Sequence, residues 1–149
     1  MKEQNFTDAI KFFRKALTIN ERSAILNFYL ASAYQNNKEL SKAEIFLNNA
    51  EKLDGNNAMI KYQKANILIN KKKLDEALKI LFELNDKMPK EAPIHILIGK
   101  IFKTKRDFAK ALAHFNTAID IDPKDSNLAK SLIEKLYSDI DGDNGVNFY

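Results

Sequence analysis

The sequence predicts an all-α protein built from stacked pairs of helices. Four alanines, Ala9, Ala43, Ala77 and Ala111, follow one another at intervals of 34 residues. Apolar residues recur around each of them at helical spacing, and a fixed period of roughly 20 to 50 residues is typical of stacked repeats. The 149 residues contain only four glycines and three prolines, as expected for helices joined by tight turns.

The clearest copy of the period lies between Pro93 and Pro123. Its small, aromatic and terminating residues are Gly99, Phe102, Phe108, Ala111, Phe115, Ala118 and Pro123. Small residues let two helices approach, aromatic rings fill the remaining gaps, and proline ends the second helix because it lacks an N–H donor. This pattern resembles the tetratricopeptide repeat (TPR), which has the same length. It therefore predicts a TPR helix-pair superhelix.

Each part of the chain can be assigned to this scheme. We predict a half repeat at 6–21, full repeats at 24–55, 58–89 and 92–123, a solvating capping helix at 126–137 and a disordered acidic tail at 138–149. A repeat cannot bury its apolar face alone. The initial half repeat therefore suggests a fragment of a longer protein, with self-association as one outcome. Gly55 is expected to end its helix in the left-handed conformation.

Composition and charge exclude several classes of protein. The chain has no cysteine, so it can form neither disulfides nor thiolate metal sites. Its start has no signal-peptide pattern, and no apolar run approaches the roughly 20 residues of a membrane helix. The net charge of +4 comes mostly from lysines at turns rather than from one helix face. We therefore expect neither membrane nor nucleic-acid partners.

No motif predicts catalysis, a cofactor or a metal. Asp139, Asp141 and Asp143 have the spacing of a calcium loop, but Asn144 stands where that loop needs glycine and the twelfth position is missing. His95 and His114 lie far apart in the sequence without metal-ligand spacing, so we predict packing or surface roles for them. We expect the chain not to be an enzyme.

The remaining candidate site is a protein-binding groove. In stacked helix pairs the first helices line the concave face, where amides bond a peptide backbone and lysines meet a carboxylate. The candidate binding residues are Phe28, Ser32, Tyr62, Asn66, Ile69, Asn70, Ile96, Lys100 and Lys103. For any one of them, packing against the next repeat is an equal alternative.

The carboxylate clamp of chaperone-binding TPR proteins is absent. The positions that carry its lysines, asparagines and arginine hold Phe28, Ser32, Gln63, Pro93 and Leu97 here. This difference argues against a co-chaperone.

The C-terminal half resembles a particular family. The segments are Ala77–Leu84, Met88–Glu91, Leu97–Lys103 and Asp120–Lys124. Together they resemble the last repeats of the cell division cycle protein 27 family, TPR scaffold subunits of the anaphase-promoting complex. The match extends from about Asn57 to Tyr137, whereas the earlier part fits by repeat pattern only. Arg106 departs from the family pattern, because glycine is usual in the turn between the two helices of this repeat. We therefore expect the conformation of this turn to be altered.

The resemblance implies a cell-cycle scaffold in the nucleus, with the cytoplasm as an alternative location. Its partners would be other ubiquitin-ligase subunits and the Ile-Arg C-terminal tails of activators. The arginine of such a tail needs an acidic partner, and Glu134 is the one inward-facing candidate. The alternative is a TPR adaptor in an unrelated multiprotein assembly.

Overall fold

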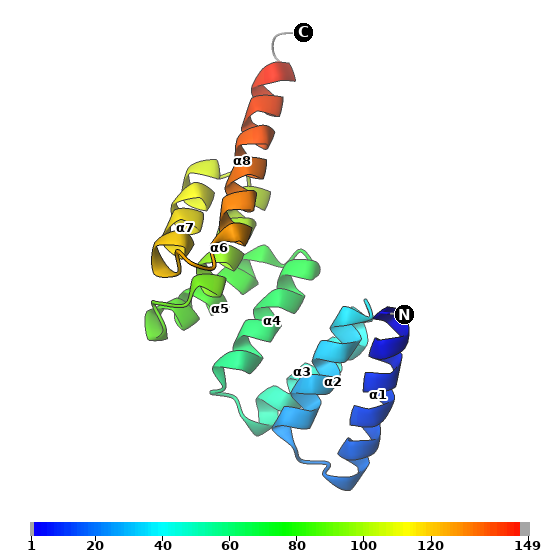
Figure 1. Ribbon diagram of the computed structural model, residues 1–149. Coiled ribbons are helices and arrows are strands. Elements are labelled where there is room, and N and C mark those ends of the chain that lie inside the picture. Colours follow the sequence, from blue (N-terminus) through cyan, green and yellow to red (C-terminus); the bar gives the residue numbers. More distant parts are fainter. Residues whose placement is uncertain (1, 147–149) are drawn as a thin grey trace. The chain divides into compact units, whose positions relative to one another are not determined.

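The chain folds into helices joined by short turns. The computed structural model describes the backbone of residues 2–146 and the side chains of residues 5–142, and within that range it contains eight α-helices and no strand (Figure 1). The helices are α1 (Lys2–Ile19), α2 (Ala24–Asn36), α3 (Leu40–Leu53), α4 (Ala58–Asn70), α5 (Leu74–Lys87), α6 (Ala92–Thr104), α7 (Phe108–Ile121) and α8 (Asn127–Val146). The all-α prediction is confirmed. Throughout residues 2–146, each helix is too short or too polar to cross a lipid bilayer.

Two compact units divide the chain, Met1–Ile80 and Leu81–Tyr149, and the border falls inside α5. In the N-terminal unit, α1 packs against α2, α2 against α3, and α3 against α4. In the C-terminal unit, α6 packs against α7 and α7 against α8. Each of these pairs consists of helices that are consecutive in the sequence, as expected for helix-pair repeats.

The core of the N-terminal unit joins small and large apolar side chains. Ala31, Ala43 and Ala50 are fully buried and let the helices approach, while Leu30 and Leu47 fill the space between them. The rings of Tyr34 and Phe46 stack with their centroids 5.5 Å apart. On α1, Phe13 packs against this core, whereas Phe12 is 67% exposed. One aromatic side chain of the first helix is thus covered and its neighbour is open.

The core of the C-terminal unit depends on one close approach. A Cβ atom built on Gly99 of α6 would lie 2.5 Å from the Phe115 ring of α7. Gly99 therefore makes room for a large aromatic ring, and Phe115 is fully buried. Ala111 of α7 is also fully buried, with Leu132 and Leu136 of α8 in the same cluster.

The turn inside each helix pair has the same backbone conformation. Lys38, Lys72 and Arg106 adopt positive φ angles of 64°, 63° and 65°. At each turn two backbone N–H groups bond back to the preceding helix. In the third turn, Arg106 N–H donates to the Lys103 carbonyl at 3.0 Å and Asp107 N–H donates to Phe102 at 2.9 Å. This is the Schellman pattern of helix ends.

Two turn predictions were wrong. Arg106 does not alter its turn, because the paired hydrogen bonds hold a non-glycine residue in the same left-handed conformation as the two lysines. Gly55 was expected to be left-handed, but the described residues contain no glycine with positive φ. Helix α3 instead ends at Leu53, and its capping residue Asp54 has a φ of −148° and a ψ of 70°.

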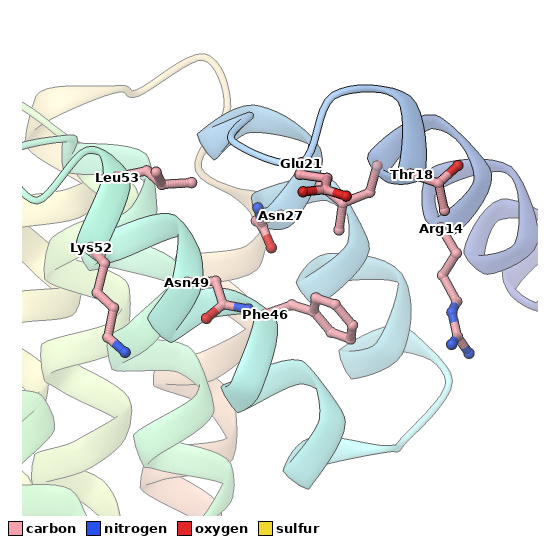
Figure 2. A pocket seen from close by; sticks show the side chains of 9 residues that line it. Arg14, Thr18, Glu21, Asn27, Phe46, Asn49, Lys52 and Leu53 are labelled. Atoms are coloured by element: carbon pink, nitrogen blue, oxygen red, sulfur yellow. The ribbon is translucent and has the colours of Figure 1, made fainter.

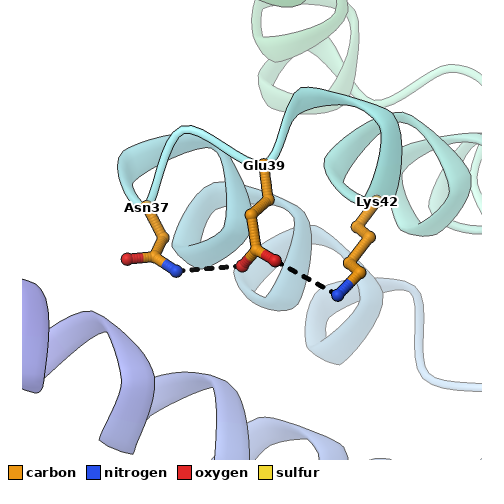
Figure 3. A network of polar contacts seen from close by, with 3 residues as sticks. All are labelled: Asn37, Glu39 and Lys42. Carbon is orange, nitrogen blue, oxygen red and sulfur yellow. Dashed lines mark hydrogen bonds and ion pairs between the residues drawn. The ribbon is translucent and has the colours of Figure 1, made fainter.

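The first of these turns also carries a polar network. The Asn37 amide nitrogen donates to one carboxylate oxygen of Glu39 at 2.9 Å, and Lys42 donates to the other at 3.1 Å (Figure 3). The hydrogen bond from Asn37, followed by the one from Lys42, lowers the pKa of Glu39. Lys42 is exposed and the other two side chains are half-buried, so the network lies near the surface where α2 gives way to α3.

The expected disordered tail is largely helical in the structure. Helix α8 continues to Val146, and residues 147–149 lie outside the described residues. Two contacts account for the difference: Ile140 packs against the C-terminal core cluster, and Asp139 forms an ion pair with Lys103 of α6 at 3.3 Å. Because α8 includes residues 139–146, the backbone of this segment is helical. A calcium loop needs a non-helical backbone at these positions, so the calcium pattern is not a calcium site.

Candidate protein-binding residues of α2, α4 and α6

Helix caps fix the two helices that carry the candidate residues of the N-terminal unit. Ser23 precedes α2 and its hydroxyl accepts a hydrogen bond from Leu26 N–H at 3.2 Å. Asn57 precedes α4 and its side-chain oxygen accepts from Met59 N–H at 2.9 Å and Ile60 N–H at 3.4 Å. These caps satisfy backbone donors of the first turn and so set where each helix starts.

Spacing by four residues places the candidates on one side of each helix. Phe28 and Ser32 share a face of α2, and Tyr62, Asn66 and Asn70 share a face of α4. Phe28 and Ser32 are half-buried, as are Tyr62, Asn66 and Ile69, whereas Asn70 is exposed. A hydrogen bond between the side chains of Gln35 on α2 and Gln63 on α4 joins the two helices.

Tyr62 and Asn66 form a polar pair on α4. Burial raises the pKa of the Tyr62 phenol, and a hydrogen bond with Asn66 opposes that rise. The phenol therefore stays neutral near pH 7 and acts as a hydrogen-bonding group. An aromatic ring beside an amide can pack against a side chain and also bond the backbone of an extended peptide.

Phe28 lies in a small hollow between α2 and α4. The hollow has a volume of about 230 Å³, and Ile25 and Met59 line it with Phe28. Ile25 is 57% exposed and Met59 is 60% exposed, so the rim is apolar and open to solvent. Asp54 and Asn57 add polar groups at the end of this hollow. Phe28 therefore lies where a partner's apolar side chain can reach it.

The candidates of the C-terminal unit have different surroundings. Ile96 packs against the core cluster of α7 and α8 and is half-buried, which fits the packing alternative better than the binding one. Lys103 is engaged with Asp139 in the ion pair described above. Lys100 is half-exposed, and its carbonyl accepts a hydrogen bond from the Thr104 hydroxyl at 3.0 Å. Glu134, the proposed acidic partner for an arginine, is exposed on α8.

The two histidines meet although 19 residues separate them in the sequence. Their rings are stacked with centroids 5.4 Å apart, and the two Nδ1 atoms are 3.2 Å apart. His95 is buried, and the Phe102 ring stacks on His114 with centroids 5.8 Å apart. Burial, followed by the charge of His95, lowers the pKa of His114. Among the side chains of residues 5–142 no group of three or more potential metal ligands gathers, so the pair has no third ligand within that range.

A second hollow was not expected from the sequence. It lies between α1, α2 and α3 and has a volume of about 500 Å³ (Figure 2). Asn27 lines it from α2, and Phe46 and Leu53 line it from α3. The signal available in the sequence is that Asn27, a polar residue, stands three residues before the buried Leu30, at an inward-facing position of its helix.

Comparison with known families identifies both halves of the chain. A family model described as "Anaphase-promoting complex, cyclosome, subunit 3" matches residues 2–84, and a "Tetratricopeptide repeat" model matches residues 92–125. The family signature therefore includes the first repeats. The expectation that the earlier part fits by repeat pattern only was wrong.

Individual proteins show the same relationship. The chain is 38% identical over 131 residues to "Anaphase-promoting complex subunit 3" of Dictyostelium discoideum, covering 87% of the chain and 14% of that protein. It is 33% identical over 112 residues to "Cell division cycle protein 27 homolog A" of Arabidopsis thaliana, covering 75% of the chain and 16% of that protein. The chain thus spans less than a fifth of these relatives.

A solved structure supports the fold independently. The crystal structure described as "YrrB: a TPR protein with an unusual peptide-binding site" superposes with a TM-score of 0.73 at 26% identity, covering 86% of the chain and 67% of that protein. The family model covers more than half of the 149 residues, and the curated relatives carry the same name over most of the chain. The chain therefore belongs to the anaphase-promoting complex subunit 3 family.

Proposed function

We propose that this chain is part of a TPR scaffold of the anaphase-promoting complex, a ubiquitin ligase of cell division, and that it binds protein segments rather than catalysing a reaction. The observation that carries the proposal is the family match over residues 2–84. The relatives bear the names of a complex subunit and of a cell division cycle protein, which also supports action in the nucleus.

The binding chemistry is suited to an extended segment or a C-terminal tail of another subunit or an activator. Phe28 offers an apolar hollow, and the Tyr62–Asn66 pair offers a ring beside an amide. Lys100, half-exposed on α6, supplies a cation for a carboxylate. In the N-terminal unit the amide can bond a segment's backbone and the hollow can take one of its side chains, and in the C-terminal unit the lysine can meet a carboxylate.

Co-precipitation of the complex by the full-length protein tests this proposal. Tyr62→Ala is expected to weaken the binding of a partner by about 2 kcal/mol, because a few aromatic side chains contribute most of the binding energy in many interfaces. Lys100→Glu is expected to slow association with an acidic or carboxylate-ended partner. The doubly substituted protein should therefore recover fewer subunits than the unmodified one.

Two matched variants serve as controls. Tyr62→Phe keeps the ring and removes only the hydroxyl, and Lys130→Glu makes the same charge change at an exposed position of α8. Circular dichroism confirms the fold of each variant first. Full recovery of every subunit by the Tyr62→Ala, Lys100→Glu protein would exclude these residues as the working surface, whereas failure of the unmodified protein to recover any subunit would contradict the scaffold role.

A further inference from the structure

The hollow between α1, α2 and α3 has a physical origin in the repeat pattern. The tetratricopeptide pattern places a tryptophan three residues before a leucine and seven before a tyrosine. Here Leu30, Ala31 and Tyr34 match the later positions, but the tryptophan position holds Asn27. An asparagine side chain is much smaller than an indole ring. The space that the ring would fill is therefore left open between the three helices.

The hollow contains a buried hydrogen-bond acceptor without a partner. Asn27 is 2% exposed, and its amide nitrogen donates to the Ser23 carbonyl at 2.9 Å. That bond fixes the orientation of the amide, because the reverse orientation would place two oxygens against each other. Within the described part of the chain the Asn27 Oδ1 atom has no hydrogen-bond partner, and Figure 2 shows it turned toward the space bordered by Phe46 and Asn49. A buried polar atom left unpaired is costly, so this oxygen favours a ligand that brings a donor.

The other residues that line the hollow indicate the polarity and charge of such a ligand. Leu17, Phe46 and Leu53 give the hollow a mainly apolar lining. Arg14 on α1 and Lys52 on α3 are exposed on opposite sides of it, with Glu21 as the single carboxylate among the lining residues. Two cations against one anion favour an acidic segment. A volume of about 500 Å³ is within the range of about 300–1,000 Å³ that is usual for ligand pockets.

We propose that this hollow binds the indole ring of a tryptophan carried by an extended acidic segment of a protein partner. The indole supplies an apolar body for Leu17, Phe46 and Leu53 and one N–H donor for Asn27 Oδ1. Acidic residues on either side of the tryptophan meet Arg14 and Lys52. The site shares no residue with the candidate binding residues of α2, α4 and α6, so it is a second docking point beyond the proposed groove function.

The first experiment uses small probes on the 149-residue chain. N-acetyl-tryptophanamide, followed by NMR, should give saturable shifts of the backbone amides of Asn27, Phe46 and Leu53. The analogue methylated at the indole nitrogen cannot donate and should bind about tenfold more weakly, which is the effect of leaving one buried acceptor unpaired. N-acetyl-phenylalaninamide should be weakened similarly. Equal affinity for the indole and its methylated analogue, or shifts that do not saturate, would overturn the proposal.

Variants of the chain test the same site from the protein side. Asn27→Leu removes the acceptor at nearly constant side-chain size, so it should weaken tryptophan binding about tenfold and remove the preference for the indole over its methylated analogue, while the melting temperature stays equal or rises. Asn48→Ala, at an exposed position next to Asn49 on α3, should leave the response unchanged. Unchanged affinity of the folded Asn27→Leu chain for tryptophan would contradict the proposal that Asn27 accepts the indole N–H.

The rim charges are tested with capped tripeptides. Asp-Trp-Asp should bind more tightly than Lys-Trp-Lys, and the difference should shrink in the Arg14→Ala, Lys52→Ala chain and at high salt. Equal affinity of the two tripeptides for the unmodified chain would exclude an acidic partner.

Discussion

The helix pairs α2–α3 and α6–α7 solve the same packing problem with different residues. At equivalent repeat positions, two periods of 34 residues apart, Ala31 and Leu47 in the first pair correspond to Gly99 and Phe115 in the second. All four residues are buried. The larger ring is accommodated by the smaller partner, since a Cβ atom on Gly99 would meet the Phe115 ring.

A second pair of equivalent positions differs more between the two helix pairs. Asn27 and Phe46 border the hollow of the first pair, whereas the equivalent residues of the second pair are the stacked His95 and His114. The two pairs of side chains are of similar combined size, but they divide it differently: a small amide faces a large ring in the first pair, and two rings of equal size stack in the second. The hollow therefore accompanies the uneven division of volume between the two positions.

The largest effect is expected from breaking the complementarity of Gly99 and Phe115. Gly99→Ala should lower the free energy of unfolding by about 1–3 kcal/mol through overpacking, because the added methyl group meets the Phe115 ring. Phe115→Leu alone should also destabilise the chain, by leaving a cavity. Urea unfolding measures both losses.

The double variant sharpens this comparison. Gly99→Ala with Phe115→Leu recreates the Ala31 and Leu47 pair of the N-terminal unit and should lose much less than the sum of the two single losses. Additive losses in the double variant would show that the two side chains do not compete for the same space.

A smaller effect is expected from acid, and only in the pair that contains histidines. Since the pKa of His114 is lowered in the folded state, the unfolded chain binds more protons below the ordinary value of 6.5. Stability should therefore be full above pH 6.5 and decrease as the pH falls through the folded pKa of His114. His114→Phe, which restores the residue found at Phe46, should remove this part of the pH dependence. Urea midpoints at pH 5 and pH 7.5 measure it, and an unchanged pH dependence in the variant would contradict the assignment.

The smallest effect concerns the turn that both pairs share. Lys38→Gly should raise the free energy of unfolding by about 0.5–1 kcal/mol, because glycine adopts a positive φ without the Cβ penalty. Arg106→Gly should gain less, since it also removes a guanidinium group that lies 5.2 Å from the Phe108 ring centroid. Thermal unfolding compares the two variants. A loss of stability in Lys38→Gly would mean that the lysine side chain contributes more than its backbone conformation costs.

The sequence was sufficient where local pattern decides the structure. The spacing of Ala43, Ala77 and Ala111 predicts buried positions on the second helix of each pair, and all three are fully buried. It was insufficient where distant residues decide. The pairing of Lys103 with Asp139 and the contact of Ile140 turn an acidic segment into helix, and the segment itself carries no sign of either contact.

The binding residues illustrate the same limit. The repeat register places Tyr62 and Asn66 on one face, because four-residue spacing is a local property of a helix. It does not show that Ile96 packs against the core or that His95 and His114 meet, because each contact depends on the size of a residue on another helix. The hollow at Asn27 likewise could not be predicted from the sequence, because it depends on whether side chains of the neighbouring helices fill the space.

The length of α8 has a consequence for how the end of the chain responds to disturbance. A helix presents partial negative charge at its C-terminus, and the last turn of α8 contains no basic residue to offset it. Gly142 and Gly145 further weaken the local preference for helix. The last turns of α8 thus depend on the ion pair of Asp139 with Lys103 and on the packing of Ile140, so displacement of α6 should unfold them before the rest of α8.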